Sequence, residues 1–408
     1  MDPQIHNIDS ESTNESTPNN LSNKSNEDKT ETKPETKNDA SKLPSEKTIS
    51  SVKSSVKDSN DSLIYLSKSK SNIINLSSGL QEILKNIEKN KEDNLNLTSE
   101  QKIELIRKEV QIQNFPLIDP DRINKFEFLG KGTYGNVFRA EFHKNGKVDK
   151  IEDIALKELQ VDKVFKDILK LLQEINMSIM SYHPFVPRFH GVYFNEYVCL
   201  IFDLVKGKSL KQVAEERYKD NFKLKLNALV KLVKIINDLH NELNIIHRDL
   251  KPDNIIVNEA DEVFLIDFGT SKVISNGDST HTYDAKGTTL YMGPENFQFD
   301  LGEDNQDEEN EKKDERPITI TVAFDVWSLG CIISEICSGI QPWKNYKKPN
   351  INETIIMKLL SEGKPFPIPV QLPNNLKELL SECFMINPDE RIKTSDLLKR
   401  LTEIMDSL

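Results

Sequence analysis

The chain has 408 residues, with 66 acidic and 54 basic side chains, and its formal net charge is −12. This acidic balance, without a basic block, argues against a nucleic-acid partner, and the lack of a long apolar run argues against a membrane span. Four cysteines scattered without metal-ligand spacing indicate a reducing compartment, so we expect an intracellular protein of the cytoplasm or nucleus.

The N-terminal part of the chain changes character along its length. Residues 1–71 begin with a stretch rich in Ser, Asn, Thr, Lys and Glu, which buries too little apolar surface to offset chain entropy and predicts a disordered tail. Residues 72–122 predict short amphipathic helices and a linker, since apolar residues recur at helical spacing and Thr98 with Gln101 fits a capping box. The pattern leaves open whether these helices pack on the main domain, bind a partner through residues 72–114, or form only transiently.

A glycine-rich segment follows a strand pattern that begins at Phe126. A bare G-x-G-x-x-G also occurs in dinucleotide-binding folds, where it opens a helix, but here a second strand follows. This strand–turn–strand form predicts a loop whose glycines let backbone amides approach phosphate oxygens. A longer hairpin loop is expected over residues 144–153, before a strand that contains Ala155 and Lys157. The segment reads Gly130-Lys131-Gly132-Thr133-Tyr134-Gly135-Asn136-Val137.

Helical and strand patterns then alternate with loops. Residues 161–182 are predicted to be helical, with Glu174 among them, and residues 198–205 read as a buried strand that enters a linker. Residues 223–243 predict a long amphipathic helix, because their leucines, isoleucines and valines recur at helical spacing.

The segment from His247 to Asn254, followed by Asp267-Phe268-Gly269, resembles the catalytic loop and the metal-binding loop of the eukaryotic protein kinases. Phosphoryl transfer needs a carboxylate that orients a hydroxyl, ligands for magnesium, and cations near the phosphates. In this pattern Asp249 is the candidate carboxylate, and Lys251 places a positive charge beside it. Asn254 and Asp267 supply the hard oxygen atoms that magnesium prefers.

Together these segments, in their order and spacing over residues 123–405, resemble the eukaryotic protein kinases. Lys251 two residues after Asp249, and Gly287-Thr288 before Tyr291, are similar to the serine/threonine kinases. The resemblance implies an α+β fold of two lobes. The small lobe (123–202) would be mostly β with one helix, a hinge (203–208) would follow, and the large lobe (209–405) would be mainly α. It also implies transfer of the γ-phosphoryl of ATP, with Mg²⁺, to hydroxyls of protein substrates.

The resemblance also gives each motif residue an expected role. Asp249 and Lys251 would be catalytic, Asn254 and Asp267 would bind the metal, and Lys157 would hold the phosphates and pair with Glu174. Backbone groups of the hinge would bond the adenine. The expected nucleotide-binding set is Leu129, Gly130, Lys131, Gly132, Thr133, Tyr134, Gly135, Asn136, Val137, Ala155, Lys157, Glu174, Asp203, Val205 and Ile256.

The resemblance further predicts two structural pairings in the large lobe. Glu295 would pair with Arg391, and Asp325 would cap the backbone of the catalytic loop. One departure from the family is Ser178, which stands where an apolar residue usually joins an internal stack, so we expect weaker coupling between helix position and activity. A second is Gly293, which replaces the usual alanine before Pro-Glu.

Two loops of the large lobe carry further predictions. Residues 300–316 are strongly acidic and predict a disordered surface loop. Asp284 stands where one group of kinases carries a loop phosphate, and we hypothesise that it supports a basal activity.

A catalytically weak pseudokinase acting as a scaffold is an alternative, although all the polar motif residues are present. A kinase of small molecules is another, although the Gly-Thr and Pro-Glu platform that cradles peptides is intact.

Overall fold

The computed structural model describes residues 76–89, 97–131, 135–143, 151–274, 280–282, 287–297, 318–346 and 351–408. The chain divides into two units, 1–62 and 63–408, and all of the described residues lie in the second. Several expectations therefore fall outside the described residues: the tail 1–71, the centre of the glycine loop (132–134), Asp284 and the acidic insertion 300–316.

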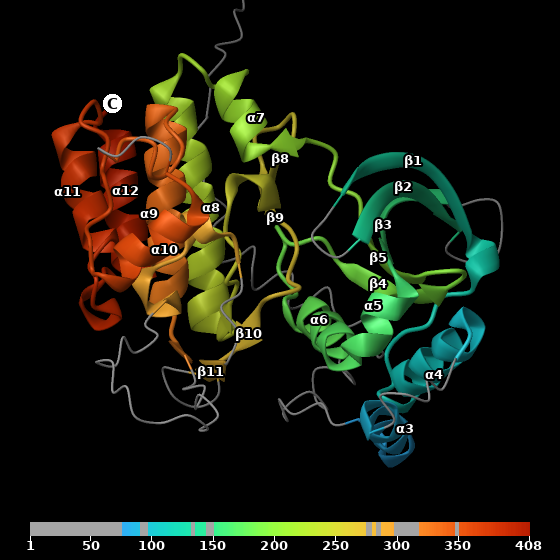
Figure 1. The fold of residues 1–408 in the computed structure, drawn as a ribbon. Helices are drawn as coiled ribbons and strands as arrows, with labels where there is room; N and C mark the ends of the chain where they lie inside the picture. The colour runs from blue at the N-terminus through green and yellow to red at the C-terminus, as the bar shows by residue number, and fades with distance from the viewer. Residues whose placement is uncertain are drawn as a thin grey trace, which may run out of the picture. The chain divides into compact units, whose positions relative to one another are not determined.

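An antiparallel sheet of five strands forms most of the small lobe, in the order β1-β2-β3-β5-β4 (Figure 1). β1 and β2 flank the glycine loop, which confirms the strand–turn–strand prediction. β3 begins at Ile151, which pairs with His143, so the expectation of a loop up to residue 153 was wrong by three residues. The strands are β1 Ile123–Lys131, β2 Gly135–His143, β3 Ile151–Leu159, β4 Phe189–Phe194 and β5 Val198–Asp203.

The predicted helix over residues 161–182 is two helices, α5 (Val161–Lys166) and α6 (Ile168–Met180). The chain leaves helical geometry at Asp167, with φ −135° and ψ 59°, and the Asp167 carboxylate accepts a hydrogen bond from the N–H of Lys170. Short polar side chains stabilise helix starts in this way, so Asp167 ends one helix and begins the next. Apolar spacing continues across the break, which is why periodicity alone did not reveal it.

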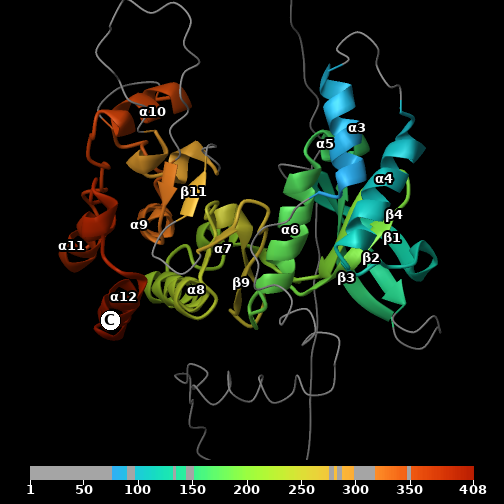
Figure 2. The ribbon, with the colours of Figure 1, turned by 90° about the horizontal axis from the view of Figure 1, so that it is seen from below.

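Two helices precede the sheet, α3 (Ser78–Lys89) and α4 (Ser99–Ile112). The predicted capping box is confirmed: the Thr98 hydroxyl accepts from the N–H of Gln101, and the Gln101 side chain accepts from the N–H of Thr98. Ile106 and Val110 of α4 are fully buried in one apolar cluster with residues of α5, α6, β4 and β5. Of the three alternatives left open by the sequence, packing on the main domain is the one that the structure shows (Figure 2).

The linker after α4 joins the edge of the sheet. The N–H of Ile118 donates to the carbonyl of Val192 on β4 at 2.8 Å, and the N–H of Val192 donates to the carbonyl of Pro116 at 2.8 Å. Gly191 has φ +152°, and a Cβ there would lie 2.8 Å from the Pro116 carbonyl. Glycine at 191 therefore permits this close approach.

The large lobe is built mainly of helices packed around one apolar core. The long amphipathic helix predicted over 223–243 is α8, at Phe222–Glu242, and α9 is buried along nearly its whole length. No helix in the described ranges is both long and apolar enough to cross a membrane. The helices are α7 Leu210–Glu215, α8 Phe222–Glu242, α9 Ala323–Ser338, α10 Glu353–Ser361, α11 Asn374–Cys383 and α12 Thr394–Asp406.

Short strand pairs fix the loops that face the small lobe. β7 pairs with β10, and β8 pairs with both β6 and β9, so the two segments that carry Asp249 and Asp267 are drawn together. β11 pairs with β12 farther along the chain. These strands are β6 Lys208–Ser209, β7 Ile245–Ile246, β8 Ile255–Val257, β9 Val263–Leu265, β10 Lys272–Val273, β11 Thr280–Thr282 and β12 Ile318–Ile320.

Candidate active site

The loop between β7 and β8 is held from below by one buried carboxylate. Asp325, near the start of α9, accepts the N–H of His247 at 2.8 Å and the N–H of Arg248 at 2.9 Å, which confirms the predicted backbone cap. Burial acts to raise the pKa of Asp325, but His240, whose Nε2 lies 2.8 Å away, and these loop contacts lower it below its usual range. The ionised form of Asp325 is thus favoured, and it can hold Arg248 at its left-handed φ of 70°.

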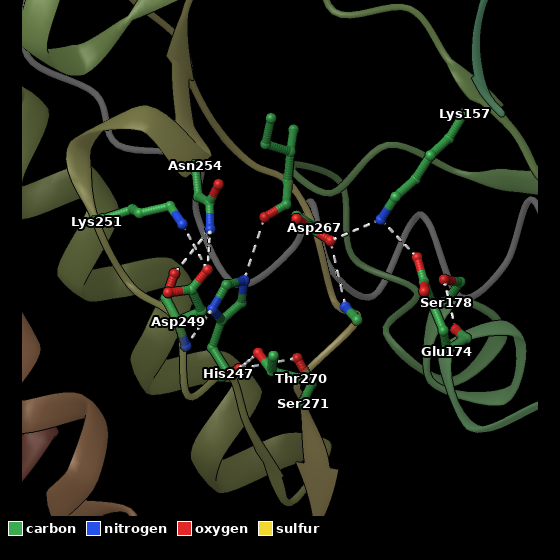
Figure 3. A network of polar contacts seen from close by, with 12 residues as sticks. Lys157, Glu174, Ser178, His247, Asp249, Lys251, Asn254, Asp267, Thr270 and Ser271 are labelled. Atoms are coloured by element: carbon green, nitrogen blue, oxygen red, sulfur yellow. Dashed lines mark hydrogen bonds and ion pairs between the residues drawn. The ribbon is translucent and has the colours of Figure 1, made fainter. Parts of the chain in front are cut away.

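Three donors surround the carboxylate of Asp249 on this loop. Lys251 Nζ donates to Asp249 Oδ2 at 2.7 Å, and Asn254 Nδ2 donates to the same oxygen at 3.2 Å (Figure 3). The hydroxyl of Thr288 donates to Asp249 Oδ1 at 2.9 Å. The residue is nearly buried, at 8% exposure, and these contacts orient its carboxylate beside Lys251 and Asn254; these two residues line the adjacent cavity, whereas Asp249 is not part of the lining.

Lys157 on β3 stands between two carboxylates from different parts of the chain. Its Nζ lies 2.7 Å from Glu174 Oε1 and 3.1 Å from Asp267 Oδ1, which confirms the predicted pairing with Glu174 (Figure 3). Burial acts to lower the pKa of Lys157, but the two carboxylates raise it well above its usual value. Burial likewise acts to raise the pKa of Asp267, and Lys157 lowers it below the usual range. Lys157 and Asp267 are therefore stabilised in their charged forms.

Asp267 and its neighbours continue the site toward the interior. Asp267 has φ 66°, and the ring of Phe268 lies 5.0 Å from that of His247 in an edge-on arrangement. Ser178, at the position where the sequence departs from the family, donates its hydroxyl to the carbonyl of Glu174 at 2.8 Å. Its side chain is thus satisfied within its own helix.

A cleft with a cavity of about 920 Å³ runs between the sheet and the β7–β9 region. Gly135 and Asn136 belong to the described residues but are not part of its lining, and residues 132–134 lie outside the description. Gly135 has a packing reason instead, because a Cβ there would lie 1.8 Å from the Glu158 carbonyl. The predicted residues that do line the cleft are Leu129, Gly130, Lys131, Val137, Ala155, Lys157, Glu174, Asp203, Val205, Lys251, Asn254, Ile256 and Asp267.

The hinge end of the cleft is fixed through Asp203. Its carboxylate lies 2.6 Å from His190 Nε2 and accepts the N–H of Arg188 at 3.2 Å, while its own N–H donates to the Arg188 carbonyl. The N–H and the carboxylate of Asp203 are therefore both engaged in hydrogen bonds to neighbouring residues. Phe202 beside it packs on Phe189, with ring centroids 5.4 Å apart.

The cleft offers two side-chain oxygen donors for magnesium, Asn254 and Asp267. No group of three or more His, Cys, Asp or Glu in the described ranges forms a ready metal cage. Magnesium is often bound by one or two protein ligands together with phosphate oxygens, and this suits an Asn–Asp pair. The amide nitrogen of Asn254 is used twice, on Asp249 Oδ2 and on the Asp249 carbonyl, which directs its side-chain oxygen elsewhere. Asn254 and Asp267 therefore fit the ion.

Below the cleft, a buried ion pair ties distant segments of the large lobe together. Arg391 donates to both oxygens of Glu295 at 2.6 Å, which confirms the predicted pairing, and it also donates to the Ala323 carbonyl at 2.9 Å. Glycine at position 293 has a packing reason, because a Cβ there would lie 2.6 Å from the Glu295 carboxylate.

Sequence reasoning missed several residues of the site. The sequence indicated Thr288 only as part of the Gly-Thr pair. Its hydrogen bond to Asp249 joins residues 39 positions apart, so the motif did not reveal this contact. Val186 and Ile266 line the cleft, yet they lie in no motif and gave no signal in the sequence.

Comparisons with known proteins show which family the chain resembles in sequence. A family model described as protein kinase domain matches residues 123–401, more than half of the chain. Cell division control protein 7 of Schizosaccharomyces pombe is 26% identical over 291 residues, which cover 71% of this chain and 24% of the relative. MAP kinase kinase kinase SSK2 of Saccharomyces cerevisiae is 28% identical over 319 residues, which cover 68% and 18%. Mitogen-activated protein kinase kinase kinase 3 of Arabidopsis thaliana is 28% identical over 277 residues, which cover 67% and 41%.

This chain thus matches less than half of the length of each of these relatives. The family match nevertheless spans both lobes, from the first strand of the sheet into α12. Its α+β architecture, with an antiparallel sheet before a helical region, is the bilobal kinase fold. The chain therefore belongs to the protein kinase family.

Proposed function

We propose that this chain is a serine/threonine protein kinase that transfers the γ-phosphoryl of ATP to hydroxyls of protein substrates. The observation that carries this proposal is the paired arrangement across the cleft. Asp249 is held by three donors on one side, and Lys157 is charged between Glu174 and Asp267 on the other. A catalytically weak scaffold would not need both arrangements intact, so we favour the enzyme.

Each residue has a defined task in the proposed reaction. Asp249 would orient the substrate hydroxyl and accept its proton as the oxygen bonds to the γ-phosphorus and the bond to ADP breaks. Lys251 would stabilise the negative charge on the transferred group, and Lys157 would hold the α- and β-phosphates. Magnesium, held by Asn254 and Asp267, would supply positive charge against the phosphate oxygens.

The preference for serine and threonine rests on contacts around Asp249. Lys251 bridges Asp249 and the hydroxyl of Thr288, at 2.7 and 3.0 Å. The names of relatives also include serine/threonine and MAP kinase kinase kinases, but because this chain spans only part of them, their pathways are not carried over. An ATP-dependent reaction and four cysteines without disulfides fit an intracellular site of action.

The test is a peptide library with serine, threonine or tyrosine at the centre, incubated with ATP and the full chain. We expect phosphorylation of serine and threonine peptides in the presence of Mg²⁺, and none after chelation or in Asp267→Ala. Nucleotide binding without phosphoryl transfer by the wild type would favour the scaffold instead. Labelling of tyrosine alone would contradict the proposed residue preference.

A further inference from the structure

Helix α4 lies directly against α5, the helix that precedes α6 and its Glu174. Ile106 and Val110 of α4 are fully buried, and they share an apolar cluster with Phe165 of α5 and Leu172 and Ile175 of α6. At the rim of this contact, Lys102 Nζ lies 2.7 Å from the Asp162 carboxylate of α5. α4 therefore packs on α5 and shares one apolar cluster with α6.

The same helix is anchored to the sheet on its other side. The Arg107 guanidinium lies over the ring of Phe194 on β4, 5.2 Å from its centre. Immediately after α4, the backbone of residues 116–118 bonds to Val192 on the same strand. A helix fixed to the sheet and packed on α5 acts as a brace between the two.

On its cleft side, α6 makes less apolar contact at Ser178 than it makes on the side that faces the cluster with α4. Ser178 follows Glu174 by one helical turn and lines the cleft, and its hydroxyl bonds back to the Glu174 carbonyl rather than packing inward. Leu172 and Ile175, in contrast, are fully buried in the cluster shared with α4. The apolar support of α6 around Glu174 is therefore stronger on the α4 side than at Ser178.

We propose that Ile106 and Val110 are positioning residues, which hold α6 so that Glu174 meets Lys157. This inference rests on the proposed kinase function and deepens it by naming what controls the site. The support lies outside residues 123–401, the part that matches the family model, so the activity of this protein would depend on a segment that precedes that match. Displacement of α4 would separate Glu174 from Lys157 and slow phosphoryl transfer.

The first experiment compares two buried truncations in the full chain. Ile106→Ala is expected to lower kcat about tenfold, because coupling between packed elements is typically of this size. KM for the peptide is expected to change little, since the peptide platform lies in the large lobe. The matched control is Leu397→Ala on α12, which is equally buried but belongs to the large-lobe core, and it should keep the wild-type kcat. Wild-type turnover in Ile106→Ala would overturn the inference.

The second experiment restores apolar contact on the cleft side. Ser178→Leu places an apolar side chain at the turn after Glu174, so α6 should depend less on α4. The loss caused by Ile106→Ala is then expected to shrink in the Ser178→Leu background. An equal loss in both backgrounds would contradict a positioning role, because a general loss of stability would not respond to residue 178.

A third measurement does not depend on activity. Amide hydrogen exchange of α6 should accelerate in Ile106→Ala and stay at the wild-type rate in Leu397→Ala. If Ile106→Ala does not fold, Ile106→Val, which removes one methyl group, should show the same changes at smaller size. An inactive wild type would refute the proposed function alone, because exchange would still report on α6. An active wild type with unchanged turnover and unchanged exchange in the variants would refute this inference alone.

Discussion

The two sides of the cleft hold their reactive groups in different ways. On the large-lobe side, buried hydrogen bonds fix the loop: Asp325 accepts two backbone N–H groups, and Arg391 makes two bonds to Glu295. On the small-lobe side, Glu174 reaches Lys157 through one ion pair, and the helix beneath it is held by apolar packing. The first side is thus fixed by directional contacts and the second by contacts that are not directional.

This difference determines which residues fix the geometry on each side of the cleft. A buried hydrogen bond is costly to leave unmade, so it fixes one arrangement of the groups that form it. Apolar burial depends mainly on area, so it permits small shifts of a helix at low cost. The large-lobe geometry therefore follows from the motif residues themselves, whereas the small-lobe geometry depends on neighbours such as α4.

The largest effect should come from the group that is fixed most rigidly. Asp249→Asn is expected to lower turnover about a thousandfold, because the carboxylate that orients the hydroxyl is lost. ATP affinity should persist, since the groups on the small-lobe side are unchanged. Lys157→Met should instead reduce both turnover and nucleotide affinity. Single-turnover kinetics and nucleotide titration measure the two effects, and a wild-type rate in Asp249→Asn would refute its role.

The buried ion pair of Arg391 and Glu295 can be broken without changing a residue of the candidate active site. Arg391→Ala leaves Glu295 buried and unpaired, which should lower the free energy of unfolding by about 3–5 kcal/mol. Arg400→Ala is the matched control, because its pair with Glu382 is partly exposed, and it should cost about 0–1 kcal/mol. Urea denaturation measures both. Equal losses would show that the buried pair does not act as a directional tie.

Acid should weaken the large-lobe side while leaving apolar packing intact. The folded-state pKa values of Asp325 and Asp267 lie below the ordinary 3.8, so their stabilisation is complete above the ordinary value. It is lost as the pH falls below the ordinary value and through the lower folded values. Urea midpoints taken across this range should decline, and they should decline less steeply in Asp325→Asn. An equal decline in both proteins would assign the acid sensitivity to other groups.

The smallest effect should come from the N-terminal end. Removal of residues 1–60 should leave the melting temperature unchanged, because their composition predicts few packing contacts. Removal of residues 1–114 should lower it, because Ile106 and Val110 leave the apolar cluster. Calorimetry of both shortened proteins separates the two segments. A clear drop after the shorter deletion would mean that the first 60 residues pack on the domain.

Much of the large-lobe side could be predicted from the sequence. The contacts of Glu295 with Arg391 and of Asp325 with the loop backbone were expected from the resemblance to the kinases, and the structure confirms them. The pairing of Lys157 with Glu174 was also expected and is confirmed. These predictions succeeded because the motif residues stand in the family's order and spacing, which the resemblance links to these partners. The catalytic and ligand-binding roles of the site residues stay predictions.

The sequence was less informative where packing decides the outcome. Helical periodicity indicated the helices before the sheet, but it cannot tell which element a helix faces, so the place of α4 stayed open. The break at Asp167 was missed because apolar spacing continues through it. The bond from Thr288 to Asp249 depends on how a distant loop folds back, which local spacing does not report.

The pairing of residues 116–118 with Val192 has a consequence for how the protein can be handled. β4 is the last strand of the sheet, and this segment covers part of its outer edge. A protein shortened to begin at residue 123, where the family match starts, would expose the N–H and carbonyl of Val192 to solvent. Uncovered strand edges recruit strands from other molecules. Such a shortened protein should self-associate as its concentration rises, so the segment before the kinase domain also protects solubility.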